Sequence, residues 1–167
     1  MLGFGIGPGF TSFTQTIQVG GLSTESPRVD KMAVITDFKI GYAPDNSWAL
    51  YYTSKVSWFG MENALGDRVT VANGLGAVAV SYWLKPLAPS PFLAAGFGYS
   101  TWLLPFEDER PDTWMGMGLF AGGGYEFSKH ASLEAYLSWG KPEDQEFGVE
   151  VSSDALSFMI TINYLGY

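Results

Sequence analysis

Few residues of this chain have the chemistry of a catalytic or metal site, because it holds one histidine and no cysteine. His130 stands two residues before Ser132, and the carboxylates of Glu134 and Asp144 follow. An imidazole, a hydroxyl and an acid are the groups of nucleophilic hydrolysis, in which histidine removes the proton of the attacking serine. The lack of cysteine excludes disulfides and thiolate metal sites.

Charged residues inside alternating segments form a second candidate site. Each lies opposite the bulky apolar residues of its own segment: Asp37, Lys39, Lys55, Glu126 and Glu134. Successive side chains of a strand point to opposite faces, so these five would share the lumen of a closed barrel. Charges in a narrow lumen are costly unless paired. We therefore predict a structural ion-pair network, with a gated conduit of rearranging pairs as the alternative.

The elements that must hold these charges are strands of about ten residues. The last one, 155–164, reads ALSFMITINY, with a bulky apolar residue at every second position and small or polar residues between them. Similar alternation recurs near 2–13, 33–43, 48–59, 69–84, 93–103, 115–127 and 131–139. The sequence predicts an all-β chain, with residues 1–167 forming one eight-stranded antiparallel up-and-down transmembrane β-barrel whose last strand closes on the first.

The composition of the two strand faces favours a membrane over water as the medium. One face is bulky and aromatic, while the other is rich in Gly, Ala and Ser. A soluble eight-stranded barrel, the main rival fold, would need all the bulky side chains inside, where eight strands leave too little room. With that face outward, an apolar belt far beyond a few hundred Å² would meet water. No apolar run approaches the roughly 18 residues of a membrane helix.

Aromatic residues recur at the ends of the apolar face. Trp and Tyr at both ends of lipid-facing strands are typical of the two interfacial girdles of a membrane barrel. The predicted girdle consists of Trp48, Trp58, Tyr82, Trp139 and Tyr164.

The connections between the predicted strands differ in length and in charge. Short turns are expected near 44–47, 85–90 and 128–130, and long polar loops near 20–31, 60–68, 105–112 and 141–154. The long loops hold thirteen acidic and five basic residues, a difference equal to the net charge of −8. The acids are Glu25, Asp30, Glu62, Asp67, Glu107, Asp108, Glu109, Asp112, Glu143, Asp144, Glu146, Glu150 and Asp154. Long extracellular loops opposite short periplasmic turns are typical of outer-membrane barrels.

Two segments carry a family resemblance. The strand PFLAAGFGY at 91–99 and the segment GGGYEF at 122–127 resemble strands of the small outer-membrane barrels of the OmpA-like and opacity-type families. The resemblance implies a porin-like barrel of the Gram-negative outer membrane, whose relatives are structural anchors, adhesion factors or small-solute pores. His130 and Ser132 also resemble the His-x-Ser pair of eight-stranded lipid A deacylases. In those enzymes the pair lies within a lipid-facing strand, whereas His130 is predicted in a turn and Ser132 faces inward.

These observations favour a non-enzymatic anchor or interaction protein in the outer membrane, with acidic extracellular loops and a lumen filled by side chains. The alternatives are a narrow pore for small solutes or ions and a lipid-modifying outer-membrane enzyme. We predict no catalytic site, no cofactor and no resident metal. Membrane lipid and lipopolysaccharide are the expected partners, divalent cations could bind the acidic loops, and nucleic acid is a poor partner for this charge. The chain opens directly into a strand, so we expect a mature form with a start Met.

Overall fold

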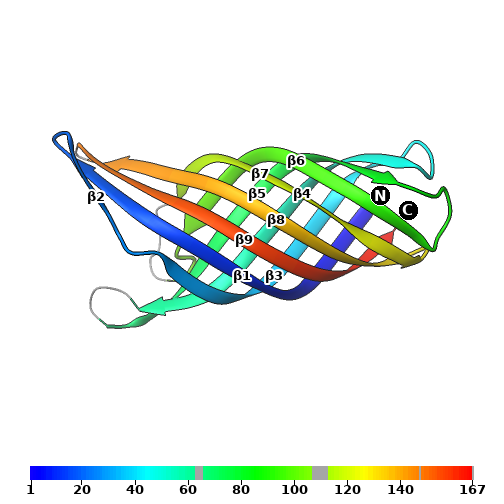
Figure 1. Cartoon of the computed structure of the whole chain (residues 1–167), viewed down its shortest axis with the longest axis horizontal. Helices are drawn as coiled ribbons and strands as arrows, with labels where there is room; N and C mark the ends of the chain where they lie inside the picture. The colour runs from blue at the N-terminus through cyan, green and yellow to red at the C-terminus, as the bar shows by residue number, and fades with distance from the viewer. Residues whose placement is uncertain (63–65, 107–112, 147, 167) are drawn as a thin grey trace.

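The computed structural model of the protein describes residues 1–62, 66–106, 113–146 and 148–166, except for the side chain of Glu146. In this part of the chain nine antiparallel strands form one sheet. The strands are β1 (Leu2–Val19), β2 (Leu22–Glu25), β3 (Val29–Tyr42), β4 (Trp48–Glu62), β5 (Arg68–Trp83), β6 (Ser90–Leu103), β7 (Trp114–Ser128), β8 (Ala131–Glu146) and β9 (Val149–Gly166). Figure 1 shows them wound obliquely around one long axis.

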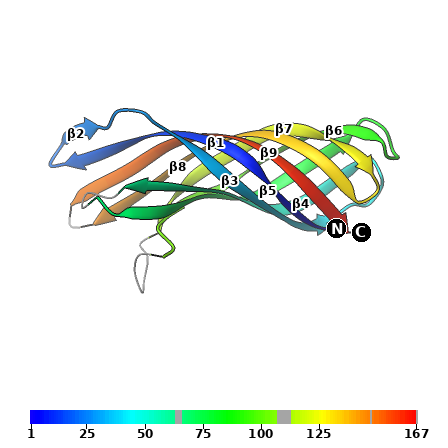
Figure 2. The ribbon, with the colours of Figure 1, turned by 90° about the horizontal axis from the view of Figure 1, so that it is seen from below.

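The sheet closes on itself through its first and last long strands. Strands β1 and β3 to β9 pair with their sequence neighbours, and β1 also pairs with β9. This seam runs from the pair Leu2↔Gly166 to the pair Val19↔Val149. The short strand β2 pairs only with the far end of β1, outside the ring of eight. The predicted eight-stranded up-and-down barrel is confirmed, and Figure 2 shows its two chain ends together at one end.

Side chains alternate between the inside and the outside of this ring. In β9 the outward Ile162 is 62% exposed, whereas the inward Ser157 is 1% exposed. In β1 the outward Phe4 is 56% exposed. Because successive side chains of a strand point to opposite faces of the sheet, one buried side chain shows which face every other side chain of that strand occupies. The phase predicted from the sequence for the last strand is therefore correct.

The outside of the barrel is a belt of exposed apolar side chains. It includes Leu2, Ile6, Val34, Ile40, Leu50, Val78, Val80, Leu93, Phe97, Met117, Leu119, Leu133, Leu137, Leu156 and Phe158. A belt of this size around all strands is stable only in an apolar medium, and a closed barrel leaves no unpaired backbone there. Within the described ranges, no helix is long and apolar enough to cross a membrane.

Two of the four long loops predicted from the sequence are wrong. The segment 20–31 contains a hairpin, in which β1 turns at Gly20 and Gly21, with φ of 57° and 87°, and returns as β2. The segment 141–154 contains the ends of β8 and β9, paired down to Glu146↔Val149 beside the turn at Gly148. Strands that leave the membrane no longer need an apolar face, so the alternation fades while the backbone ladder continues.

The two ends of the barrel therefore differ. We call the end with the β1–β2 and β8–β9 turns the hairpin end; Figure 1 shows it on the left. The opposite end, which we call the short-turn end, has the connections β3–β4, β5–β6 and β7–β8 and both chain termini. The acids predicted in the loop 107–112 lie outside the described residues.

Candidate functional site in the lumen

The lumen of the barrel is filled because glycines on some strands face bulky side chains from others. A Cβ atom added to Gly96 of β6 would lie 2.5 Å from Phe120 Cε1, and one added to Gly122 of β7 would lie 2.6 Å from Tyr136 Cδ1. Phe120 and Tyr136 are each 1% exposed, with their rings 5.3 Å apart and perpendicular. The glycine-rich inner faces noted in the sequence are thus the surfaces on which these rings lie.

Four of the five predicted lumen charges meet in one cluster. Asp37 is the register partner of Lys55 on the adjacent strand, and its carboxylate accepts a 2.6 Å hydrogen bond from the Lys55 ammonium. Lys39 lies 3.4 Å from the same carboxylate oxygen and also donates to Glu134 of β8. Two carboxylates and two ammonium groups balance one another, as burial requires.

Neutral groups complete the hydrogen bonding of these carboxylates. Thr53 donates to Asp37 at 2.9 Å, and Ser132 donates to Glu134 at 2.8 Å. The Tyr136 hydroxyl also donates to Glu134. We call Asp37, Lys39, Lys55, Glu134 and Tyr136 the charged layer.

Aromatic faces supply further contacts to the ammonium groups of the charged layer. The Lys55 nitrogen lies 4.0 Å from the centre of the Tyr136 ring and 5.1 Å from that of Phe120. A cation over an aromatic face is attracted to its quadrupole, and the attraction grows when water is excluded. Lys55 is 1% exposed, so the ring faces replace part of the hydration that its ammonium group loses.

The fifth predicted charge, Glu126, lies apart from the charged layer. It is 7% exposed, and its carboxylate accepts a 2.5 Å hydrogen bond from the Trp83 indole nitrogen. No Lys or Arg nitrogen of the described residues lies within 4.0 Å of it. The prediction of one five-membered network is therefore wrong at this position. Strand alternation fixes the face of a residue, but its level along the barrel depends on the pairing register.

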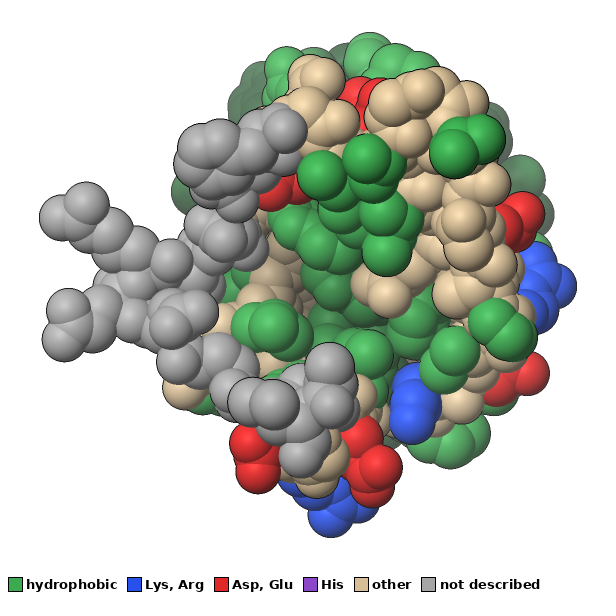
Figure 3. Space-filling model, turned by 90° about the vertical axis from the view of Figure 1, so that its left-hand side faces the viewer, with side chains coloured by type: hydrophobic (Ala, Val, Ile, Leu, Met, Phe, Trp, Pro, Cys, Tyr) green, Lys and Arg blue, Asp and Glu red, His purple; other side chains and the backbone are tan. Residues whose placement is uncertain are grey.

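A second set of side chains closes the lumen nearer the hairpin end. Phe13, Phe59 and Trp102 are each at most 4% exposed, and the ring centres of Phe13 and Trp102 are 4.8 Å apart. Phe59 lies 5.8 Å from Phe13 and 5.7 Å from Trp102. We call these three residues the aromatic layer. Figure 3 looks onto this end and shows hydrophobic side chains across the centre of the opening, with charged ones at its rim.

Sequence reasoning did not identify the aromatic layer. Its three residues lie on the inward phase of their strands, at or just beyond the ends of the apolar stripes. Extending the alternation past the membrane belt would have placed all three in the lumen. Between the two layers, the hydroxyl of Thr11 hydrogen-bonds those of Ser57 and Ser157, at 2.7 and 2.8 Å.

The His-x-Ser pair noted in the sequence is not joined by a hydrogen bond between its two members. The His130 ring nitrogen Nδ1 lies 2.8 Å from the Leu165 carbonyl oxygen, and the ring stacks on Tyr164. Ser132 is fully buried in the lumen and donates to Glu134. An imidazole that activates a serine needs a direct hydrogen bond to that hydroxyl. Each group here is instead engaged elsewhere.

The predicted girdle residues lie on the outer face at two levels. Trp48 and Tyr82 are register partners near the short-turn end, where Tyr164 also lies. Trp58 and Trp139 lie toward the hairpin end, and their indole nitrogens donate to Thr36 at 2.9 Å and to Asp154 at 3.1 Å. Ten residues along β4 span about 25 Å of membrane at a typical tilt, close to the height of an apolar band.

The described part of the chain contains no group of three or more His, Asp or Glu side chains able to hold a metal ion. The cation binding predicted for the acidic connections stays a prediction.

No family model and no curated protein matches this chain. Among solved structures it is similar to the outer membrane protein OprG from Pseudomonas aeruginosa, with 13% identity, a TM-score of 0.51 and coverage of 97% of this chain and 94% of that one. It also aligns with Neisserial surface protein A, at 10% identity and a TM-score of 0.48 over 96% of each chain. A third alignment is to Ail of Yersinia pestis, at 11% identity and a TM-score of 0.40 over 98% of this chain and 99% of that one.

The similarity to OprG concerns the fold, and it agrees with the closed sheet and the apolar belt described above. The chain has the fold of a small Gram-negative outer-membrane β-barrel. The resemblance read from the segments 91–99 and 122–127 is therefore confirmed at the level of fold.

Proposed function

We propose that this barrel is a non-enzymatic anchor of the outer membrane, with a closed lumen and an acidic hairpin end available to partners outside the cell. The observation that carries the proposal is the closure of the lumen at two levels, by the charged layer and by the aromatic layer. The outer face would contact membrane lipid and lipopolysaccharide. An anchor needs a stable barrel and an exposed end, and it needs no path through the lumen.

The charged layer opposes conduction energetically as well as sterically. An ion that passes it must separate Lys55 from Asp37 or Lys39 from Glu134. Breaking a buried pair leaves a charge without compensation, at a cost of about 3–5 kcal/mol. The ion would then meet the rings of the aromatic layer, which offer no polar atom except the Trp102 indole nitrogen.

The surroundings of His130 and Ser132 support a non-enzymatic role over a lipid-modifying enzyme. A hydrolase acting on lipid needs its nucleophile at the lipid face, and Ser132 is directed into the lumen. The imidazole is held against the β9 backbone.

The exposed acids of the hairpin end support an interaction role for that end. Glu25, Asp30, Glu62, Asp67 and Glu143 all lie on exposed positions of the strands and turns there. Such a surface attracts cations and basic partners and repels nucleic acid. We propose that a partner outside the cell, or a divalent cation, binds at this acidic surface.

A narrow pore is the second candidate, and one observation favours it. The lumen opens at the short-turn end into a hollow of about 800 Å³, which could serve as the mouth of a channel. For conduction the lysines of the charged layer would have to swing aside.

Single-channel recording in planar bilayers distinguishes these two functions. The protein is refolded in detergent, checked by strand-type circular dichroism and by heat-modifiable migration on a gel, and inserted into the bilayer. We expect no discrete conductance from the unmodified protein. The double variant Phe13→Ala with Lys39→Ala removes one bulky side chain from each layer and should conduct, which makes it the positive control. Phe13→Ala alone leaves the charged layer complete and should not conduct. Steady discrete channels from the unmodified protein would refute the closed lumen and favour the pore.

A further inference from the structure

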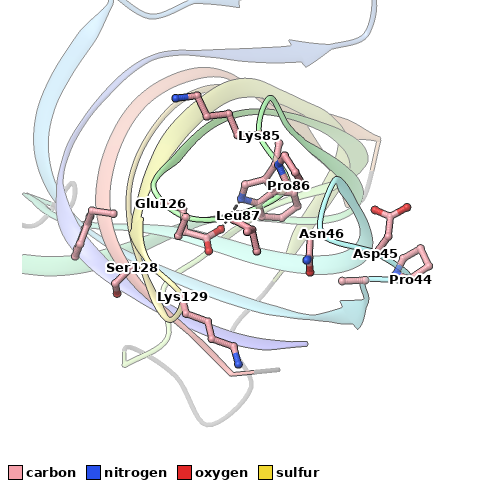
Figure 4. Close-up of a pocket in the computed structure, with 13 residues that line it drawn as sticks. Pro44, Asp45, Asn46, Lys85, Pro86, Leu87, Glu126, Ser128 and Lys129 are labelled. Atoms are coloured by element: carbon pink, nitrogen blue, oxygen red, sulfur yellow. Dashed lines mark hydrogen bonds between the residues drawn. The ribbon is translucent and has the colours of Figure 1, made fainter.

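The hollow at the short-turn end has the features of a ligand site. It lies between the three short turns, has a volume of about 800 Å³, and is lined by Asp45, Trp83, Lys85, Leu87, Glu126 and Lys129 among others. This volume is within the range of small-molecule sites. Figure 4 looks into the hollow and shows the side chains of all three turns around it.

The floor of the hollow combines one anionic group with an aromatic surface. Glu126 and Trp83 are 7% and 8% exposed, and Trp83 packs against the ring of Phe92 at 5.2 Å. The hydrogen bond from the Trp83 indole fixes one oxygen of the Glu126 carboxylate, Oε2. For the other oxygen, Oε1, the described residues provide no hydrogen-bond donor.

The Glu126 carboxylate lacks the compensation that the charged layer has. Across the end of the barrel His130 attracts the Glu126 carboxylate, while Glu134 repels it. Lys85 and Lys129 line the rim, where both are exposed, and Figure 4 shows their ammonium groups apart from the carboxylate. A carboxylate with one free oxygen that opens onto an aromatic-lined hollow favours a cationic hydrogen-bond donor beside it.

We propose that this hollow binds an organic ammonium compound with an aromatic or apolar body. The ammonium group donates to Glu126 Oε1 and lies beside the Trp83 indole, where carboxylate and ring attract it together. The apolar body lies against Pro86 and Leu87, which line the same hollow. A metal ion would find too few oxygen ligands here, and an anion would be repelled by the carboxylate at the floor. The site does not depend on whether the lumen conducts.

Calorimetry of the detergent-folded protein with tryptamine tests the proposal. Tryptamine carries an ammonium group on an aromatic body, and tryptophol is its neutral counterpart with a hydroxyl group. We expect tryptamine to bind more tightly than tryptophol, and Glu126→Gln to weaken tryptamine by about tenfold or more while leaving tryptophol unchanged. The matched control is Asp45→Asn, which removes the same charge at the rim and should change tryptamine affinity less than threefold.

A second readout keeps the test independent of the stability of the variant. At equal occupancy, the NMR signal of the Trp83 indole N–H in the unmodified protein should shift more with tryptamine than with tryptophol, because its acceptor Glu126 gains a charged second donor. Equal affinity for the two probes, or an unchanged tryptamine affinity in folded Glu126→Gln, would overturn the proposal. Loss of binding in Asp45→Asn alone would also overturn it, by placing the cation at the rim.

Discussion

The charged layer and the aromatic layer close the same lumen by different physical means. In the charged layer each side chain is held by specific partners, such as the three donors around Glu134. In the aromatic layer Phe13, Phe59 and Trp102 hold one another by ring contacts without direction-dependent pairing. Removing one ionised member of the charged layer leaves its partner buried without full compensation, whereas removing one ring of the aromatic layer leaves a cavity. The two layers should therefore differ in how they tolerate substitution.

The largest expected effect comes from Glu134→Ala. The change leaves Lys39 with Asp37 as its remaining ion-pair partner and removes the acceptor of Ser132 and Tyr136. We expect the free energy of unfolding to fall by about 3–5 kcal/mol, measured by urea denaturation in lipid vesicles. Glu25→Ala on exposed β2 is the control and should change it by about 0.5 kcal/mol or less. Equal effects of the two substitutions would show that the charged layer is not held by its pairing.

A smaller loss is expected from Phe13→Ala in the aromatic layer. The substitution removes a ring that is 1% exposed and leaves a cavity between Phe59 and Trp102. Destabilisation should be about 3 kcal/mol, near the low end for buried phenylalanine, because the two remaining rings can move together. Denaturation under the same conditions measures it, and Phe13→Leu should recover at least half of the loss. A larger loss for Phe13→Ala than for Glu134→Ala would show that the aromatic layer tolerates substitution less well than the charged layer.

The smallest expected effect is that of removing two charges together. Asp37→Asn alone leaves Lys55 without its ion-pair partner and should cost about 3 kcal/mol. Adding Lys55→Met removes the orphaned charge, while Lys39 keeps Glu134. The double variant should lie within about 1 kcal/mol of the unmodified protein, and the double-mutant cycle gives the pairing energy directly. If the loss of the double variant equals the sum of the losses of Asp37→Asn and Lys55→Met measured separately, pairing does not explain how the charges are tolerated.

The faces of the strands could be predicted from the sequence, because alternation has a period of two. Asp37, Lys39, Lys55 and Glu134 are directed inward, as the sequence indicates, and Phe158 and Ile162 are directed outward. These assignments need no knowledge of how strands are paired.

The levels of residues along the barrel could not be predicted in the same way. Glu126 and Glu134 are both inward, yet Glu134 contacts Lys39 and Glu126 contacts Trp83. Which inward residues meet depends on strand tilt and register, which a single strand does not reveal. The ends of β8 and β9 were missed because the apolar signal stops at the membrane boundary, while backbone hydrogen bonding continues to the turn at Gly148.

The β1–β9 seam has a consequence for how the chain acquires its structure. Its contacts join residues as far apart as Leu2 and Gly166, so the final pairing must wait until the whole chain has been synthesised. Contacts of such long sequence separation form slowly, because closing the long loop between them loses chain entropy before the contacts contribute any stabilising energy. Until they form, the first and last strands each carry an unpaired edge that lipid cannot satisfy. The barrel therefore closes only when β9 pairs with β1, and a chain truncated within β9 could not complete a barrel.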